Sequence, residues 1–253
     1  MGRILALANQ KGGVGKTTSA VNIAASLGIL GKKVLLVDLD PQGSATGSLG
    51  ISKKSLGFSM ADLLIGGCSV ENALIHTEFQ GLDLLPANIS LAGADFDLIE
   101  KENPEAGLRR LLVGLKDEYD FIILDCPPSL GMLTVNAMAA SDGVIIPMQC
   151  EYFALEGLSQ LMMTVRRIKK RYQPRLALTG ILVTMYNGRL TLSTQVMAEL
   201  EKHYGEALFK TTVSRNVRLC EAPSYGKPVW YYDKSAKGAK EYLRVAEELL
   251  ARA

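Results

Sequence analysis

The sequence has few cysteine and histidine residues, and they lie far apart. The two histidines are His76 and His203, and no two of the four cysteines form a C-x-x-C pair. This spacing is typical neither of a disulfide framework nor of a zinc site, and two histidines do not favour a histidine-based metal cluster. We therefore expect the cysteines to pack as small hydrophobic side chains, at Cys68, Cys126, Cys150 and Cys220.

The sequence also lacks a long apolar run, and neither sign of charge dominates. No run reaches the roughly 18 apolar residues of a transmembrane helix, and the residues from Met1 to Leu5 do not begin a secretory signal. Lys and Arg together number 28 against 26 for Asp and Glu, which excludes a polybasic tail but leaves a local basic face open. We expect a protein that stays in the cytoplasm and does not bind membranes.

Aliphatic residues are abundant: 48% of the 253 residues are hydrophobic and only 6% are aromatic. Short aliphatic runs alternate with helical stretches, and several runs are apolar at nearly every position, as in strands buried on both faces of a parallel sheet. This predicts an α/β fold, with a doubly wound, mostly parallel sheet flanked by helices on both faces, in a single domain over residues 1–253. The predicted strands are Arg3–Ala8, Lys33–Asp38, Leu82–Pro86, Tyr119–Asp125, Gly143–Pro147 and Leu176–Thr184. The predicted helices are Lys16–Leu30, Leu91–Glu100, Glu105–Lys116, Leu130–Ala140, Glu151–Lys170, Leu192–His203 and a last one from about Ala236.

A glycine-rich segment follows the first predicted strand and opens the first predicted helix. Glycines let a backbone wrap closely around phosphate oxygens, and the positive end of the helix then attracts their charge. We expect Lys16 to contact the β- and γ-phosphates of ATP and the Thr17 hydroxyl to bind Mg²⁺. The segment reads Lys11-Gly12-Gly13-Val14-Gly15-Lys16-Thr17-Thr18.

Three aspartates end or follow apolar strands at positions that face such a crevice. Asp125 closes a strand of the Walker B type, so it is the predicted Mg²⁺ partner, acting through water. Asp38 and Asp40 follow the second strand, and the roles of second Mg²⁺ contact and positioner of the attacking water remain open between them. Either aspartate could instead cap a turn before a helix.

Four segments together resemble one family over nearly the whole chain. Gln10–Thr17 resembles the deviant Walker A motif, in which Lys11 is the signature lysine, and the other three segments are Gln149–Leu158, Thr184–Arg189 and Arg215–Pro228. The sequence thus resembles the short, chromosomal-type ParA/Soj partitioning ATPases, which are related to MinD. It departs from them where Asn187, Ser214 and Cys220 replace the usual Asp, Pro and Ser.

The resemblance implies Mg²⁺-dependent ATP hydrolysis in an ATP-bound homodimer. Lys11 would reach across the dimer to the partner's nucleotide, and a second cation there would stabilise charge in the transition state. Asp40 would position water, leaving Asp38 near the metal, so that Lys11, Lys16 and Asp40 would be catalytic. Met185 and the segment around Pro223 would approach the adenine.

The same resemblance implies sequence-independent binding of double-stranded DNA. It points to Arg189 and Arg218, and less directly to the cations that end the predicted helix Glu151–Lys170. A ParB/Spo0J-like centromere-binding protein would stimulate hydrolysis and release the ATPase from the nucleoid, so that a chromosome or plasmid is segregated. No helix-turn-helix segment precedes the glycine-rich loop, as expected for the short branch.

Three alternative functions remain open at this point. A MinD-like membrane ATPase would need an amphipathic C-terminal helix, whereas residues 239–253 mix charges around a narrow apolar stripe typical of a packed helix. An iron–sulfur ATPase resembling the nitrogenase iron protein would need cysteines in glycine-rich loops. A nucleotide-binding scaffold without turnover would not need the acidic residues.

Overall fold

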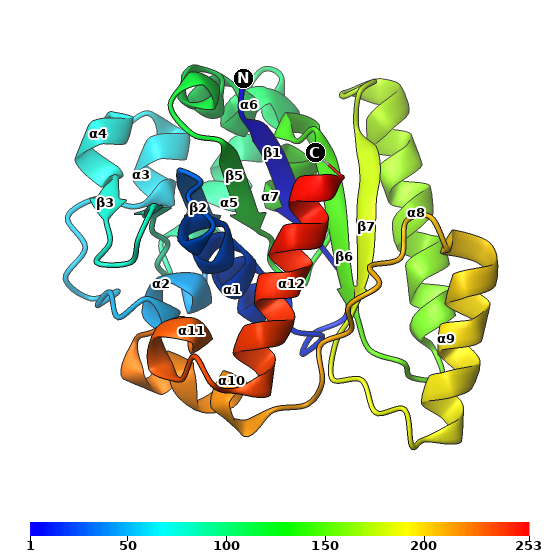
Figure 1. Cartoon of the computed structure of the whole chain (residues 1–253). Coiled ribbons are helices and arrows are strands. Elements are labelled where there is room, and N and C mark those ends of the chain that lie inside the picture. The colour runs from blue at the N-terminus through cyan, green and yellow to red at the C-terminus, as the bar shows by residue number, and fades with distance from the viewer. Residues whose placement is uncertain (253) are drawn as a thin grey trace.

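A seven-stranded sheet forms the centre of the structure, a computed structural model that describes residues 1–252. Its strands are β1 (Arg3–Leu7), β2 (Val34–Asp38), β3 (Ile75–His76), β4 (Leu82–Leu85), β5 (Phe121–Asp125), β6 (Gly143–Met148) and β7 (Ala177–Val183). They lie in the order β3-β4-β2-β5-β1-β6-β7, and each neighbouring pair is parallel except β3 with β4 (Figure 1). The predicted α/β class is confirmed.

The strand order places a change of winding direction at the middle of the sheet. β1 lies between β5 and β6, with β2 and β4 to one side and β7 to the other. Ligands of open α/β sheets bind beyond the carboxyl ends of the strands at such a point. Asp38 of β2 and Leu7 of β1 both lie opposite Asp125 of β5, so two carboxylates meet at this edge.

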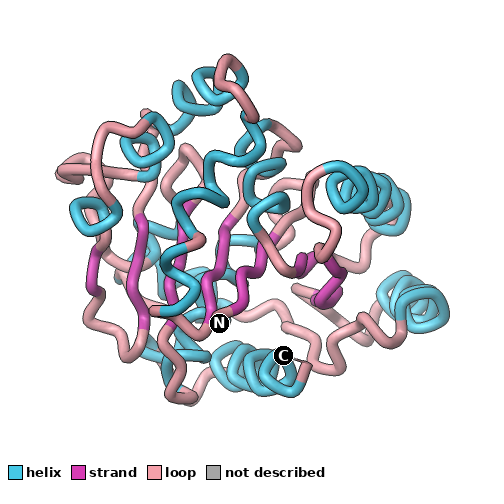
Figure 2. The backbone as a smooth tube through the Cα atoms, turned by 90° about the horizontal axis from the view of Figure 1, so that it is seen from above, coloured by secondary structure: helices cyan, strands magenta, loops and turns pink. Residues whose placement is uncertain are grey.

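Helices cover both faces of the sheet (Figures 1 and 2). α1 (Lys16–Ile29) and α12 (Lys237–Ala251) pack together on one face, and α5 (Leu91–Ile99), α6 (Gly107–Leu112) and α7 (Met132–Ala140) lie on the other. α8 (Ala154–Arg171) and α9 (Thr191–Tyr204) lie beside β7. The short helices are α2 (Ser44–Ser48), α3 (Met60–Ile65), α4 (Val70–Ala73), α10 (Val217–Glu221) and α11 (Val229–Tyr232), with 3₁₀ turns η1 (Pro104–Ala106), η2 (Gly114–Asp117) and η3 (Ala222–Tyr225). Within residues 1–252, no helix has both the length and the apolar character needed to cross a membrane.

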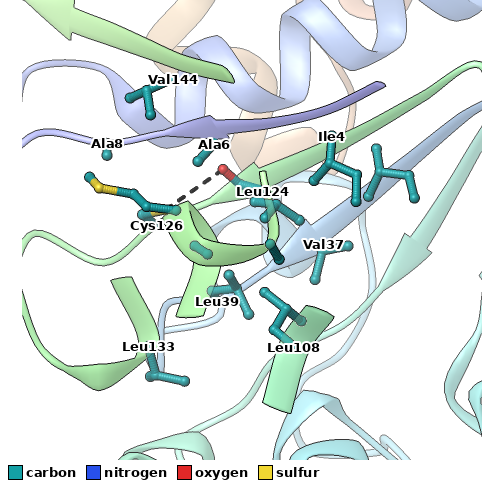
Figure 3. Packing of buried hydrophobic residues seen from close by; sticks show 14 of the residues in the cluster. Ile4, Ala6, Ala8, Val37, Leu39, Leu108, Leu124, Cys126, Leu133 and Val144 are labelled. Carbon is teal, nitrogen blue, oxygen red and sulfur yellow. Dashed lines mark hydrogen bonds between the residues drawn. The ribbon is translucent and has the colours of Figure 1, made fainter. Parts of the chain in front are cut away.

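Neighbouring residues of the central strands face opposite layers of helices. Ala6 of β1 belongs to one core cluster and Leu7 to the other. Figure 3 shows part of the cluster that contains Ala6. In it, Ala6 of β1 and Val37 of β2 lie on the face of the sheet that Leu108 of α6 covers. Because both faces are buried, the strands must be apolar at nearly every position, as the sequence is.

The helix predicted over Glu105–Lys116 is wrong as a continuous element. The chain forms η1, α6 and η2 instead, and glycines at positions 107 and 114 begin the second and third pieces. Glycine weakens a helix because the unfolded chain loses more backbone freedom there. The helix predicted from Glu151 begins three residues later, at Ala154.

The remaining differences are small. The six predicted strands are confirmed to within two residues at each end, whereas β3 and the five short helices were not predicted. Of the cysteines, Cys126 is buried as expected, but Cys220 is exposed, so that expectation is wrong for Cys220.

Candidate active site

The glycine-rich loop joins the carboxyl end of β1 to the first turn of α1. Gly13 and Gly15 have φ angles of 74° and 81°, a left-handed conformation that other residues adopt at a penalty. Two distant side chains hold the loop: Gln149 Nε2 donates to the Gly13 carbonyl and Thr184 Oγ1 to the Val14 carbonyl, each at 2.8 Å. The loop is therefore fixed before any ligand binds, with the N-terminus of α1 directed at whatever occupies it.

A cavity of about 620 Å³ opens above this loop. It brings together most of the predicted site residues from four separate parts of the chain. Val14 is buried beneath the cavity, and Lys11 lies outside it. The residues that line it are Gly12, Gly13, Gly15, Lys16, Thr17, Thr18, Asp40, Gly43, Ser44, Gly47, Ser48, Lys53, Pro128, Met185 and Pro223.

Lys16 is the cation at the centre of the loop. Its side chain is mostly buried, and its Nζ donates to the Lys11 carbonyl at 3.2 Å. Burial lowers the pKa of Lys16, and the charge of Asp125 opposes that shift. A phosphate beside this ammonium would favour the charged form further.

Asp125 lies beneath the cavity and is fully buried, yet neither of its carboxylate oxygens has a hydrogen-bond partner among residues 1–252. Burial, and then the charge of Asp38, raise the pKa of Asp125 well above its usual value, while the nearby Thr17 hydroxyl and Lys16 oppose the shift. Buried polar groups normally have hydrogen-bond partners, so the unpartnered carboxylate of Asp125 needs an explanation. Mg²⁺ prefers carboxylate and hydroxyl oxygens together with water. The pair Asp125 and Thr17 fits that ion.

Asp38 is as buried as Asp125, but its oxygens are occupied. Oδ1 accepts from the Asp40 backbone N–H at 3.1 Å, and Oδ2 accepts from both the backbone N–H and the hydroxyl of Thr46 at 2.8 Å. Burial raises the pKa of Asp38 to about 6, although the hydrogen bonds from Thr46 oppose that shift. Asp38 thus holds α2 against β2 and fixes the backbone of Asp40.

Asp40 stands on a turn at the edge of the cavity. Its Oδ1 accepts from the backbone N–H of Gln42 at 2.9 Å. Lys53 Nζ donates to the Gln42 carbonyl at 2.8 Å and also lines the cavity. Sequence reasoning missed Lys53, because no motif or spacing links it to Asp40.

A second hollow of about 240 Å³ adjoins the first and shares Gly15, Thr18, Met185 and Pro223 with it. Met185 has a φ of 50°, which is uncommon for a residue with a side chain. The walls combine apolar and polar groups, which suits a pocket for the adenine base of a nucleotide. The other lining residues are Thr184, Val213, Ser214, Arg215, Asn216, Leu219, Cys220 and Tyr242.

The two predicted DNA contacts differ in their surroundings. Arg189 is exposed on the segment between β7 and α9, and its side chain forms no ion pair within residues 1–252. Arg218 of α10 contacts Glu221 at 2.7 Å and Asp233 at 3.4 Å. Both segments lie at the carboxyl edge of the sheet, whereas the cationic end of α8 lies at the opposite edge (Figure 1). Their contacts with DNA stay predictions.

Comparison with known proteins extends the resemblance to the whole chain. A family model for an AAA domain matches residues 2–178. The chain is 50% identical over 251 residues to the sporulation initiation inhibitor protein Soj of Bacillus subtilis, covering 99% of both proteins. It is 44% identical over 252 residues to the chromosome partitioning protein ParA of Caulobacter vibrioides, covering 99% of this chain and 94% of that protein.

A solved structure is also similar over nearly the whole chain. The cobyrinic acid a,c-diamide synthase of Mycobacterium smegmatis, with bound ADP and magnesium, is similar with a TM-score of 0.86 at 40% identity. The match covers 99% of this chain and 94% of that one. The similarity therefore includes the late segments around Met185 and Pro223 as well as the glycine-rich loop.

Proposed function

The chain belongs to the ParA/Soj family of chromosome-partitioning P-loop ATPases, and we propose that it hydrolyses ATP to ADP and phosphate at the cavity above the glycine-rich loop. The observation that carries this proposal is the pair of unpartnered oxygens of the buried Asp125, next to Thr17 and Lys16. A carboxylate left without partners in a core is destabilising unless a cation joins it. The bound ADP and magnesium of the similar M. smegmatis structure support the same cofactors, ATP and Mg²⁺, here.

Each residue of the site then has a distinct role. Lys16 and the loop amides hold the β- and γ-phosphates, and Thr17 and Asp125 would hold Mg²⁺, which neutralises phosphate charge when bound. Asp40, on the cavity wall, orients the attacking water. Asp38 supports Asp40 through its backbone N–H, and we assign it this supporting role in preference to a direct metal contact.

We further propose that ATP joins two copies and that the dimer binds DNA without sequence preference. Lys11 does not line the cavity of its own copy, which supports assigning it to a nucleotide held by another copy. Arg189 and Arg218 of both copies would contact phosphates of the nucleoid. A ParB/Spo0J-like partner that stimulates hydrolysis would release the dimer and move a chromosome or plasmid.

The C-terminal helix favours this function over a MinD-like membrane role. The apolar side of α12 is buried against the sheet and α1, including Tyr242, Val245 and Leu249. Tyr242 also shares a hydrogen bond of 3.0 Å with Ser19 of α1. Because that side is already covered, it is not available for a bilayer. The contact of Tyr242 with α1 supports the single domain that we propose for residues 1–253.

One experiment tests the proposal. ATP turnover is measured with Mg²⁺ alone, with DNA, and with DNA plus the cognate ParB-like protein, using Lys16→Ala as the control. We expect slow turnover that DNA and the partner raise together, and none in the control. Equal turnover in the control would show a contaminating ATPase, and no turnover under any condition would refute the proposal.

A further inference from the structure

The side chain of Lys11 is held by a residue far away in the sequence. Its ammonium forms an ion pair with the carboxylate of Glu151, 140 positions along the chain, and the two side chains are 49% and 46% exposed. Glu151 lies between β6 and α8, outside any regular element. None of the roles assigned above uses this residue.

The segment that carries Glu151 is fastened to the glycine-rich loop at further points. Asn9 Nδ2 donates to the Pro147 carbonyl at 2.8 Å, and Gln149 Nε2 donates to the Gly13 carbonyl at 2.8 Å. The Lys11 backbone N–H in turn donates to Asn9 Oδ1 at 3.0 Å. These hydrogen bonds fix the two backbone segments relative to each other. The positions of Lys11 and Glu151 are therefore defined by the fold and not only by the flexibility of two long side chains.

We propose that Glu151 is a positioning residue that acts through Lys11. In a single copy, Glu151 holds the ammonium of Lys11 at the rim of the cavity, away from phosphate. When a second copy brings bound ATP, its phosphates compete for this ammonium and the ion pair opens. The inference rests on the ATP-dependent dimer proposed above and specifies what keeps a lone copy from using Lys11.

The geometry and charges favour this exchange. Lys11 does not line its own cavity, although its neighbour Gly12 does, and its carbonyl accepts from Lys16. An ammonium has three N–H donors, but a partner's phosphate and the carboxylate of Glu151 repel each other, so the two anions compete for Lys11. The phosphates of ATP carry more negative charge than one carboxylate, so Lys11 binds them in preference to Glu151 in the dimer. The ion pair with Glu151 must open first.

The size of the effect follows from the exposure of the pair. An exposed ion pair contributes up to about fivefold to an equilibrium constant. A dimer forms by opening two such pairs, so removing the pair favours dimerisation by up to about 25-fold. Salt screens exposed charges, so this advantage shrinks as ionic strength rises.

The test compares wild type with Glu151→Gln, Lys11→Ala and the double variant in the full chain. Glu156→Gln is the matched control, because it removes the same charge on the first turn of α8, and within residues 1–252 the one side-chain hydrogen bond of Glu156 is accepted from the Gln160 amide, at 3.4 Å. Light scattering follows dimer formation against a slowly hydrolysed ATP analogue with Mg²⁺, and turnover is measured across protein concentrations. Thermal melting checks that each variant is folded.

We expect Glu151→Gln to dimerise at several-fold lower analogue or protein concentration and to turn over faster only at low protein, with the same limiting kcat. The advantage should disappear in high salt and in the Lys11→Ala background, and Glu156→Gln should match wild type. Weaker dimerisation of Glu151→Gln, behaviour equal to Glu156→Gln, or an advantage that persists without Lys11 would each overturn the inference. A wild type that neither dimerises nor hydrolyses ATP would overturn the proposed function as well, which separates the two failures.

Discussion

Replacing Asp125 by asparagine should stabilise the nucleotide-free protein at neutral pH, even though it damages the site. The carboxylate is fully buried and neither oxygen has a hydrogen-bond partner within residues 1–252, so its charge is favoured only by the nearby Thr17 hydroxyl and Lys16. What the substitution removes is a charge that burial and Asp38 both disfavour, as the raised pKa of Asp125 indicates. The neutral amide has nearly the same shape, so packing changes little.

The sign and size of the effect follow from proton linkage. A carboxyl with a raised pKa keeps its proton in the folded protein at pH values where the unfolded chain has lost it. The free energy of unfolding therefore falls as pH rises from about 4, until the folded group ionises. Each pH unit is worth about 1.4 kcal/mol, so the penalty from Asp125 at pH 7 cannot exceed about 4 kcal/mol. An unpartnered amide N–H would offset part of the gain, so we expect about 1–4 kcal/mol at pH 7.

Asp38 provides an internal reference for the pH range. Its pKa of about 6 gives a decline in stability that ends near pH 6. Because each charge disfavours the other, the slope that separates wild type from Asp125→Asn above that pH belongs to the pair, with Asp125 as the group removed. Urea unfolding with a chelator at pH 5, 6, 7 and 8 measures both slopes, and Asp97→Asn, at an exposed position of α5, is the matched control.

Adding Mg²⁺ and a slowly hydrolysed ATP analogue should then work against the variant. A ligand at 100 times its Kd stabilises the folded state by about 2.7 kcal/mol. The free energy of unfolding of wild type should rise by this amount and that of Asp125→Asn by much less. The stability advantage of the variant should therefore shrink or reverse. A variant less stable than wild type at pH 8 without Mg²⁺ would show that the carboxylate makes favourable contacts, and the reasoning would be refuted.

Three further predictions concern binding, chemistry and DNA. Lys16→Ala should weaken binding of a fluorescent ATP analogue by about ten- to hundredfold, since charge-assisted hydrogen bonds to phosphate are lost; unchanged affinity would exclude the role of Lys16. Asp40→Ala should keep nucleotide affinity and dimerisation but lower the hydrolysis rate by about 100-fold or more, measured by phosphate release; near-normal release would move that role to another group. Arg189→Ala should reduce DNA affinity and flatten the log–log salt dependence by about two, one contact per copy, in a gel shift with two unrelated duplexes. Arg218→Ala should have the smaller effect because Arg218 is already paired, and the opposite ranking would contradict this assignment.

The central part of the fold could be predicted because its signals are local. β1, β2 and β5 are apolar at successive positions, and the glycine-rich loop marks where α1 begins. β3 has only two residues, Ile75 and His76, which is too short to show a strand pattern, although its partner β4 begins only six positions later. α3 did carry a usable signal, since Ser59 and Asp62 form a capping box.

The site divides in the same way. Motifs identified Lys16, Thr17 and Asp125, because each belongs to a short motif that follows or ends a single strand, β1 or β5. The sequence left Asp38 and Asp40 open, and only their hydrogen bonds distinguish a carboxylate with occupied oxygens from one at a cavity wall. Contacts between distant segments, such as Lys11 with Glu151, have no local pattern, since they depend on how β6 lies beside β1.

The surroundings of Arg218 have a consequence for the DNA-binding face as a whole. Two carboxylates, those of Glu221 and Asp233, already contact this guanidinium, so moving it to a DNA phosphate exchanges one anion for another. Such an exchange contributes less than a newly made contact, and a single copy then offers Arg189 as its stronger contact. Because counterion release grows with the number of phosphates neutralised, two copies joined by ATP would, in the proposed mechanism, bind DNA with a combined affinity that neither copy approaches alone. On this proposal, the weakness of each copy is what would make DNA binding depend on the nucleotide: a surface rich in free cations would hold DNA in every state, and hydrolysis could not release it.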